Sequence, residues 1–124
     1  MKIADFGLAV SVPNGLADWF GHAGTLGYMA PEILRRHKYN QSADIFSLGA
    51  ILFYLLTRTH LFNEPDPEKM KVLNSECNWV YPDNFTPSKS LNDVFEQTLS
   101  KESKDRPTAS KLLKNVWLQN LMIK

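Results

Sequence analysis

The chain is poor in several features that mark whole classes of protein. Its 124 residues include one cysteine, Cys77, which excludes an internal disulfide and fits a reducing compartment. The net charge of +1 gives no excess of either sign that would attract nucleic acid or a membrane surface. The longest apolar run, 45–56, is shorter than the roughly twenty residues of a bilayer-spanning helix, and residues 1–5 carry no secretory pattern. We therefore expect a cytoplasmic protein with neither a nucleic-acid nor a membrane partner.

What is present indicates one mainly α-helical domain. Hydrophobic residues make up 44% of the chain, enough for a core of ordinary size. The central run, 45–56, is apolar on every face, which is typical of a helix buried at the centre of a domain. We expect this helix to start at a Ser42 cap, to carry Asp44 in its first turn and to have the other helices packed around it.

Four more helices are expected from their start signals, which are a proline at the first helical position, a capping side chain or an early acid. These signals lie at Pro31 (running toward Arg36), Asp66, Ser90 and Thr108. The helix behind Ser90 should bury the 3.6-period set Leu91, Val94, Phe95, Thr98 and Leu99, and the last helix should bury Leu112, Leu113 and Val116. Residues 1–4 look like the end of a strand, while 8–26 and 79–87 lack periodicity and are expected to be loops.

Two sequence blocks lie at either end of the first loop. Asp5-Phe6-Gly7 joins a carboxylate to a glycine that lets the backbone turn sharply. That tripeptide is a weak signal alone. The second block, Gly24-Thr25-Leu26-Gly27-Tyr28-Met29-Ala30-Pro31-Glu32, is far more specific. In this order the blocks resemble the start and the end of the activation segment of a eukaryotic protein kinase.

The resemblance implies a role for each matching residue. Asp5 would be the metal ligand that holds Mg²⁺ against the phosphates of ATP, with Phe6 packed inward and Gly7 as the pivot of this cofactor-binding motif. Thr25 would support the catalytic aspartate through a hydrogen bond. Thr25, Leu26, Gly27 and Tyr28 together would dock the protein substrate. A hydroxyl at Thr25 fits the serine/threonine kinases.

Three further stretches match the same family in the expected order. Residues 42–49 resemble the start of its central helix, where Asp44 would accept hydrogen bonds from the catalytic-loop backbone. Lys104-Asp105-Arg106-Pro107 resembles the motif whose arginine forms a buried ion pair with the glutamate of Ala-Pro-Glu, which here means Arg106 with Glu32. Residues 113–118 resemble the end of the domain. The resemblance implies a partial kinase domain over 1–118 and a C-terminal tail over 119–124.

Within the family the chain is most similar to the calcium/calmodulin-dependent serine/threonine kinases. Residues 19–28 and 32–36 carry this similarity, which implies calmodulin or another regulator as a partner of the parent kinase. The position four residues before Thr25 is Gly21, which has no hydroxyl. We therefore expect a parent enzyme that does not need activation-loop phosphorylation.

The order of the motifs also bears on activity. In the family the glycine-rich loop, the lysine-bearing strand and the catalytic loop all precede Asp-Phe-Gly, whereas residues 1–4 alone precede Asp5. We expect this C-terminal-lobe fragment to be inactive by itself and to belong to a complete kinase that phosphorylates serine and threonine hydroxyls. The alternative is a catalytically dead kinase-lobe remnant that binds proteins, through Trp19-Phe20 or Leu61-Phe62. A helical interaction domain unrelated to kinases is the third interpretation.

Overall fold

The computed structural model describes residues 2–18 and 24–123. Within these ranges the regular structure is helical apart from one isolated antiparallel bridge between Ala17 and Tyr39. In chain order the elements are α1 (Pro31–Leu34), α2 (Ser42–Thr57), α3 (Pro67–Glu76), α4 (Lys89–Thr98), the 3-10 turn η1 (Ser103–Asp105), α5 (Ala109–Leu112) and α6 (Val116–Met122). The mainly α fold class is confirmed. None of these helices is both long and apolar enough to span a membrane.

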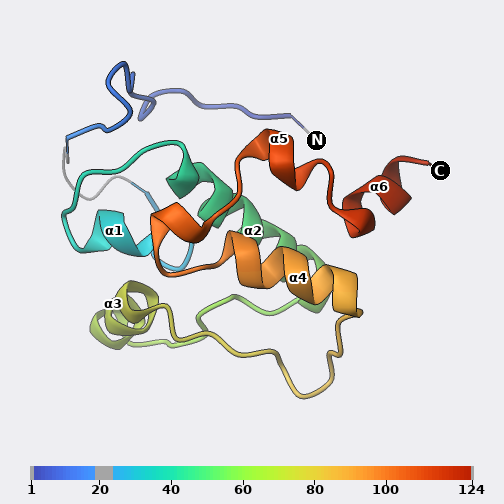
Figure 1. The fold of residues 1–124 in the computed structure, drawn as a ribbon. Helices are drawn as coiled ribbons and strands as arrows, with labels where there is room; N and C mark the ends of the chain where they lie inside the picture. Colours follow the sequence, from blue (N-terminus) through green and yellow to red (C-terminus); the bar gives the residue numbers. More distant parts are fainter. Residues whose placement is uncertain (1, 19–23, 124) are drawn as a thin grey trace.

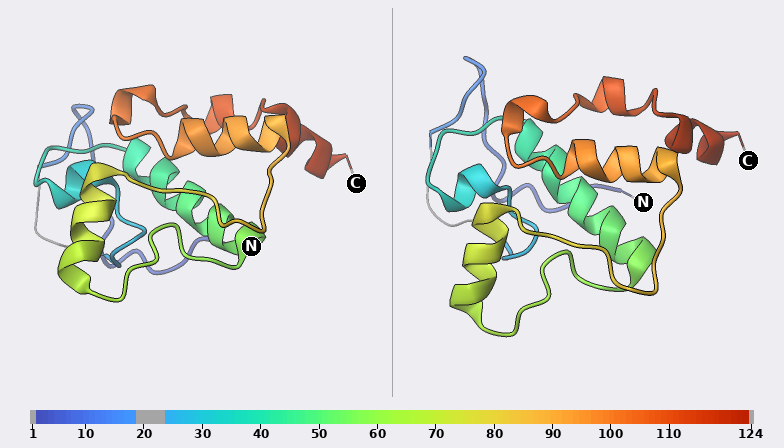
Figure 2. Two further views of the ribbon diagram at one scale, coloured as in Figure 1. Left: turned by 90° about the horizontal axis from the view of Figure 1, so that it is seen from below. Right: turned by 60° about the horizontal axis from the view of Figure 1, so that its bottom comes forward.

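Helix α2 forms the centre of the molecule (Figure 1). Its inward face contributes Phe46 and Phe53, which are fully buried, and α4 packs against it through the equally buried Phe95. The rings of Phe53 and Phe95 meet edge to face with their centroids 5.5 Å apart. Helix α3 contacts α1, and the two helices lie next to each other in both views of Figure 2.

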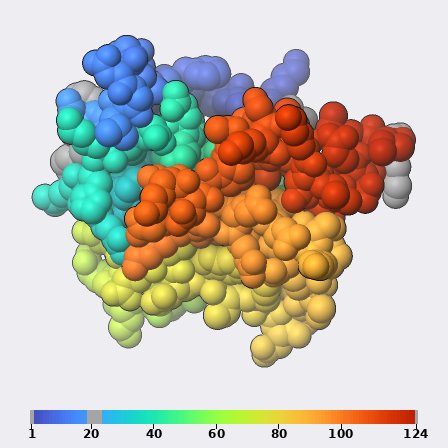
Figure 3. Space-filling view, viewed as in Figure 1, coloured from blue at the N-terminus to red at the C-terminus, as the bar shows by residue number. Residues whose placement is uncertain are grey.

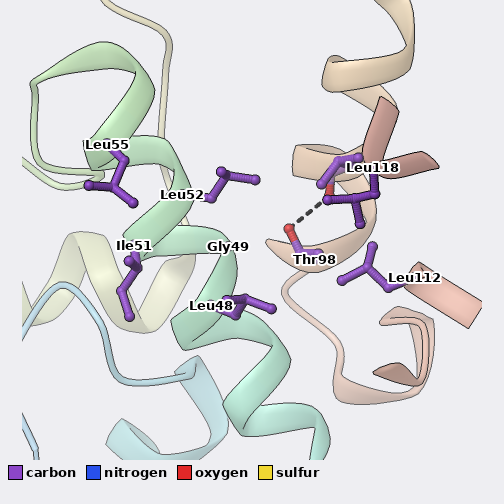
Figure 4. Close-up of a pocket in the computed structure, with 9 residues that line it drawn as sticks. Leu48, Gly49, Ile51, Leu52, Leu55, Thr98, Leu112 and Leu118 are labelled. Carbon is purple, nitrogen blue, oxygen red and sulfur yellow. Dashed lines mark hydrogen bonds between the residues drawn. The ribbon is translucent and has the colours of Figure 1, made fainter. Parts of the chain in front are cut away.

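One face of α2 is exposed, so the expectation that it is buried on every side is wrong in that respect. Leu48, Ile51 and Leu55 expose 40%, 39% and 48% of their surfaces. They line an apolar groove whose opposite wall includes Leu112 and Leu118 (Figure 4). Helix α4 and η1 contact α2, and its buried side chains join the core, whereas Tyr54 and Leu56 are each 38% exposed.

The helix starts confirm two of the predicted caps and correct two. Asp66 caps α3 and Thr108 caps α5, each through its side-chain oxygen. Ser42, by contrast, is the first residue of α2, and its own backbone N–H donates to Oδ1 of Asn40. The cap of α4 is Ser88 and not Ser90, because Ser88 has the extended backbone that lets its Oγ accept from the N–H of Leu91.

The C-terminal helix is divided in two. Asn115 caps a separate α6 by accepting from the N–H of Trp117. Since this break redirects the chain, Leu113 and Val116 are 54% and 63% exposed, so their predicted burial is wrong, whereas Leu112 is buried. Helix α1 is also shorter than expected, because Arg36 takes a left-handed conformation with φ of 62°.

The N-terminal segment, residues 2–16, is exposed except for the half-buried Val12, and in Figure 3 it lies above the helical body in blue. Residues 2–4 do not form the predicted strand, because no described strand pairs with them. Within the loop expected over 8–26, residues 13–15 form a turn, with φ of 82° at Gly15. The Trp19-Phe20 pair and Gly21 lie outside the described residues.

Candidate functional site

The segment 24–30, which we call the docking segment after the role predicted for it, joins the first loop to α1. It begins with a turn in which the N–H of Tyr28 donates to the carbonyl of Thr25 over 3.2 Å. Gly27 has φ of 88° in this turn, a conformation that glycine adopts without strain. Thr25 is exposed, Leu26 and Tyr28 are half-buried, and Gly27 is buried. Thr25 at the start of the turn is thus exposed to solvent, while Gly27 later in the turn is buried.

Two polar side chains hold the backbone of the docking segment. Oγ of Ser47, in α2, donates to the carbonyl of Tyr28 over 2.8 Å. The carboxamide of Asn74, in α3, accepts from the N–H of Gly27 over 2.8 Å and donates to the carbonyl of Met29 over 2.9 Å. These bonds satisfy buried backbone groups that lack helical or sheet partners.

The side chain of Tyr28 meets an aromatic pair on the outer side of the segment. Its hydroxyl lies 3.2 Å from Nδ1 of His60. The ring of His60 stacks on Tyr54, with centroids 4.8 Å apart. Tyr28 is therefore held through its ring as well as through its carbonyl.

Glu32 and Arg106 form the predicted buried ion pair. Both carboxylate oxygens accept from the guanidinium, each over 2.7 Å, and the two residues expose only 9% and 6% of their surfaces. Arg106 also donates to the carbonyl of Ser42, at the start of α2, and lies over the ring of Phe46 at 5.1 Å from its centroid. The pair therefore ties α1, directly after the docking segment, to the central helix.

The Asp5-Phe6-Gly7 motif lies apart from this arrangement. Residues 2–11, which include the motif, are exposed, and the N-terminal segment runs along one side of the molecule in Figure 1. Phe6 is 70% exposed, so the expectation that it packs inward is wrong within the described chain, where no core side chain covers it. The left-handed residue is Asp5, with φ of 63°, and not Gly7, whose N–H donates to Oδ1 of Asp5 over 3.3 Å.

The described residues provide only part of a magnesium site. The exposed carboxylate of Asp5 has the right chemistry, because Mg²⁺ takes oxygen ligands. Across 2–18 and 24–123, however, no group of three His, Cys, Asp or Glu side chains could hold a metal ion. Asp5 can supply one ligand, and the described chain does not build the rest of a site.

Asp44 and the pair Leu61-Phe62 complete the predicted set. Asp44 is exposed in the first turn of α2, where a further segment could reach its carboxylate. Leu61 and Phe62 are 6% and 2% exposed, so they belong to the core, and their expected use as a protein contact is wrong.

Comparison with known proteins decides the family. The family model described as protein kinase domain matches residues 1–118. The chain belongs to the protein kinase family. It is 35% identical over 122 residues to the calcium/calmodulin-dependent protein kinase type II alpha chain of Drosophila melanogaster, with 95% of this chain covered. It is 33% identical over 122 residues to the type II subunit delta of Oryctolagus cuniculus, with 97% covered. This kinase chain spans 23% of the length of each relative.

The match confirms the resemblance of the kinase chain to the calcium/calmodulin-dependent group. Two residues that hold the docking segment were not assigned a role from sequence. Ser47 lies inside the motif 42–49, where only Asp44 was given a function. Asn74 interrupts the half-buried apolar side of α3 that Met70 and Leu73 form and that Cys77 continues, and this polar residue at an apolar position was the available signal.

Proposed function

We propose that this chain is the C-terminal lobe of a serine/threonine protein kinase that transfers the γ-phosphate of ATP to hydroxyls of a protein substrate. The observation that carries the proposal is the anchored docking segment. Its turn exposes the hydroxyl residue Thr25, while Ser47, Asn74 and the Glu32–Arg106 pair fix the backbone behind it. A peptide laid along a segment held in this way would present its hydroxyl in a constant position.

In this proposal each residue of the chain has a limited task. Thr25 hydrogen-bonds the catalytic aspartate, and Leu26, Gly27 and Tyr28 contact the substrate backbone and side chains. Asp44 holds the backbone of the catalytic loop, and Asp5 gives Mg²⁺ one carboxylate ligand. Bound magnesium would neutralise charge on the ATP phosphates. The other ligands, the nucleotide pocket and the aspartate base come from residues of the parent kinase outside this chain.

The partners follow from the relatives. Both are named as calcium/calmodulin-dependent, so we include calmodulin or another regulator of the parent kinase in the proposal, beside the protein substrate. A cytoplasmic location, expected from the single cysteine, belongs to the same proposal. We also propose that residues 1–118 form the partial kinase domain. Helix α6 crosses this boundary, because it ends at Met122.

The test uses the complete reading frame that contains this chain. Phosphate transfer from Mg²⁺-ATP to serine and threonine peptides is measured for the parent kinase and for Asp5→Asn. We expect Asp5→Asn to lower kcat at least about a hundredfold, the scale on which one stabilising group is lost. Asp83→Asn, which alters an exposed aspartate in the loop after α3, is the matched control and should keep full activity. A parent protein without transferase activity would favour the protein-binding remnant, whereas a fully active Asp5→Asn variant would contradict the proposed role of Asp5 as a magnesium ligand.

A further inference from the structure

The most deeply buried side chain of α3 is polar. Asn74 is 0% exposed and is the one buried residue of that helix, whereas Met70 and Leu73 on the same side, and Cys77 directly after the helix, are half-buried. An amide side chain at such a position is unfavourable unless its hydrogen-bonding groups are paired. The buried amide of Asn74 therefore needs hydrogen-bond partners, and the backbone of the docking segment provides them.

The carboxamide of Asn74 fits the backbone of the segment as a second peptide group would. Gly27 has an N–H to donate and Met29 has a carbonyl to accept, which fixes the orientation of the amide between them. Both residues are buried, and neither belongs to a helix or strand. Because these backbone groups have no regular partner, Asn74 determines where the chain on both sides of Tyr28 lies.

We propose that Asn74 is a positioning residue for protein-substrate docking, which couples α3 to the docking segment of the kinase. The inference rests on the proposed function. Asn74 does not touch substrate; it acts through the backbone of Gly27 and Met29, next to the proposed docking residues.

The remaining anchors show what would change without Asn74. Ser47 would still hold the carbonyl of Tyr28 from α2, and the ion pair of Glu32 would still hold α1. The segment would then be fixed at Tyr28 and at its far end, while the N–H of Gly27, inside the turn that exposes Thr25, would be unpaired. Peptide binding should weaken, whereas nucleotide binding, which does not use this segment, should not.

The experiment compares two variants of the complete kinase. Asn74→Leu keeps the shape and the burial of the side chain and removes both hydrogen bonds. Thr98→Val is the matched control, because Thr98 is 1% exposed and its hydroxyl donates to the carbonyl of Val94 within α4. For Asn74→Leu we expect the peptide KM to rise at least fivefold with the ATP KM within twofold. Thr98→Val should lower the melting temperature and leave both KM values within twofold.

A second measurement reports on the segment itself. Hydrogen–deuterium exchange of the peptide covering residues 24–29 should be slow in the parent kinase, at least tenfold faster in Asn74→Leu and unchanged in Thr98→Val. If Asn74→Leu does not fold, Asn74→Ser, which shortens the side chain and leaves space for water, is measured in the same two ways.

The outcomes separate the two proposals. A raised peptide KM together with faster exchange supports the positioning role. An unchanged peptide KM in an active kinase overturns it, and so does exchange at the parental rate. If the parent protein phosphorylates no peptide while exchange in 24–29 still depends on Asn74, the proposed kinase activity fails and the structural coupling of α3 to the segment stands.

Discussion

The guanidinium of Arg106 and the carboxylate of Glu32, far apart in sequence, face each other with both N–O distances at 2.7 Å. The remaining N–H groups of Arg106 donate to the carbonyls of Ser42, Ser100 and Lys101. A guanidinium has five N–H donors, so all of them are used. One side chain thus fixes α1, the start of α2 and the turn that leads into η1.

Removing Arg106 should destabilise the lobe strongly. In Arg106→Ala the buried carboxylate of Glu32 loses its partner, and breaking such a pair lowers the free energy of unfolding by roughly 3–5 kcal/mol. Urea denaturation of the complete kinase measures the change. Lys104→Ala, which removes an exposed cation two residues away, is the control and should change stability by less than about 0.5 kcal/mol. An Arg106→Ala variant as stable as its parent would show that the pair adds nothing.

Gly49 should not tolerate even one added methyl group. A Cβ on Gly49 would lie 2.5 Å from Oγ1 of Thr98 and 2.9 Å from Cδ2 of Leu99, both in the contact between α2 and α4. We expect Gly49→Ala to destabilise by about 1–3 kcal/mol through overpacking. In a double-mutant cycle, Thr98→Ala should cost less in the Gly49→Ala background than in the parent. Strict additivity of the two substitutions would contradict the predicted contact.

These contacts differ in how far the sequence predicts them. The Arg106–Glu32 pair was predictable because each partner lies in its own motif, and the apolar face of α4 was predictable because its period is clear. Ser88 and Ser90 are the same residue type, so only the backbone conformation decides which one caps α4. Asn74 binds backbone groups of Gly27 and Met29, which have no sequence signature. The exposure of Phe6 depends on what packs against it, which local sequence does not specify.

Arg58, at the C-terminal end of α2, is a site where glycine should stabilise the protein. Its backbone is left-handed, with φ of 61°, and its N–H donates to the carbonyl of Tyr54. A side chain in this conformation is strained by about 1 kcal/mol, which glycine avoids. Arg58→Gly should therefore raise the melting temperature. Arg58→Ala, which loses the same charge but keeps a Cβ, should not, and equal effects of the two variants would assign the change to charge.

Cys77 should react slowly with alkylating reagents until the solution is strongly alkaline. Burial raises the pKa of its thiol from 9.0 to about 11, and Sγ donates to the carbonyl of Leu99 over 3.1 Å. Iodoacetamide labelling of the Cys77 peptide, followed by mass spectrometry, should reach half its maximal rate near pH 11 in the folded kinase and near pH 9 in urea.

The same pKa difference predicts an alkaline loss of stability. Because the unfolded chain releases the thiol proton first, the stability contributed by the protonated thiol is complete below pH 9.0 and is lost as the pH rises toward about 11. Cys77→Ala should remove this component from the pH dependence of unfolding. If the variant and the parent lose stability in parallel over this window, the thiol is not its source.

Charged substitutions on the exposed face of α2 should have different effects in the isolated chain and in the complete kinase. Ile51 and Leu55 line the apolar groove, and under the proposed function residues of the parent kinase outside this chain cover it. Replacing both by lysine should reduce self-association of the 124-residue chain, seen by light scattering, because it removes an apolar patch. In the complete kinase the same charges would be buried, so the melting temperature should fall. Val80→Lys, at a residue 80% exposed in the loop after α3, controls for added charge and should do neither. A complete kinase that accepts both lysines without loss of stability would mean that this face of α2 stays open to solvent.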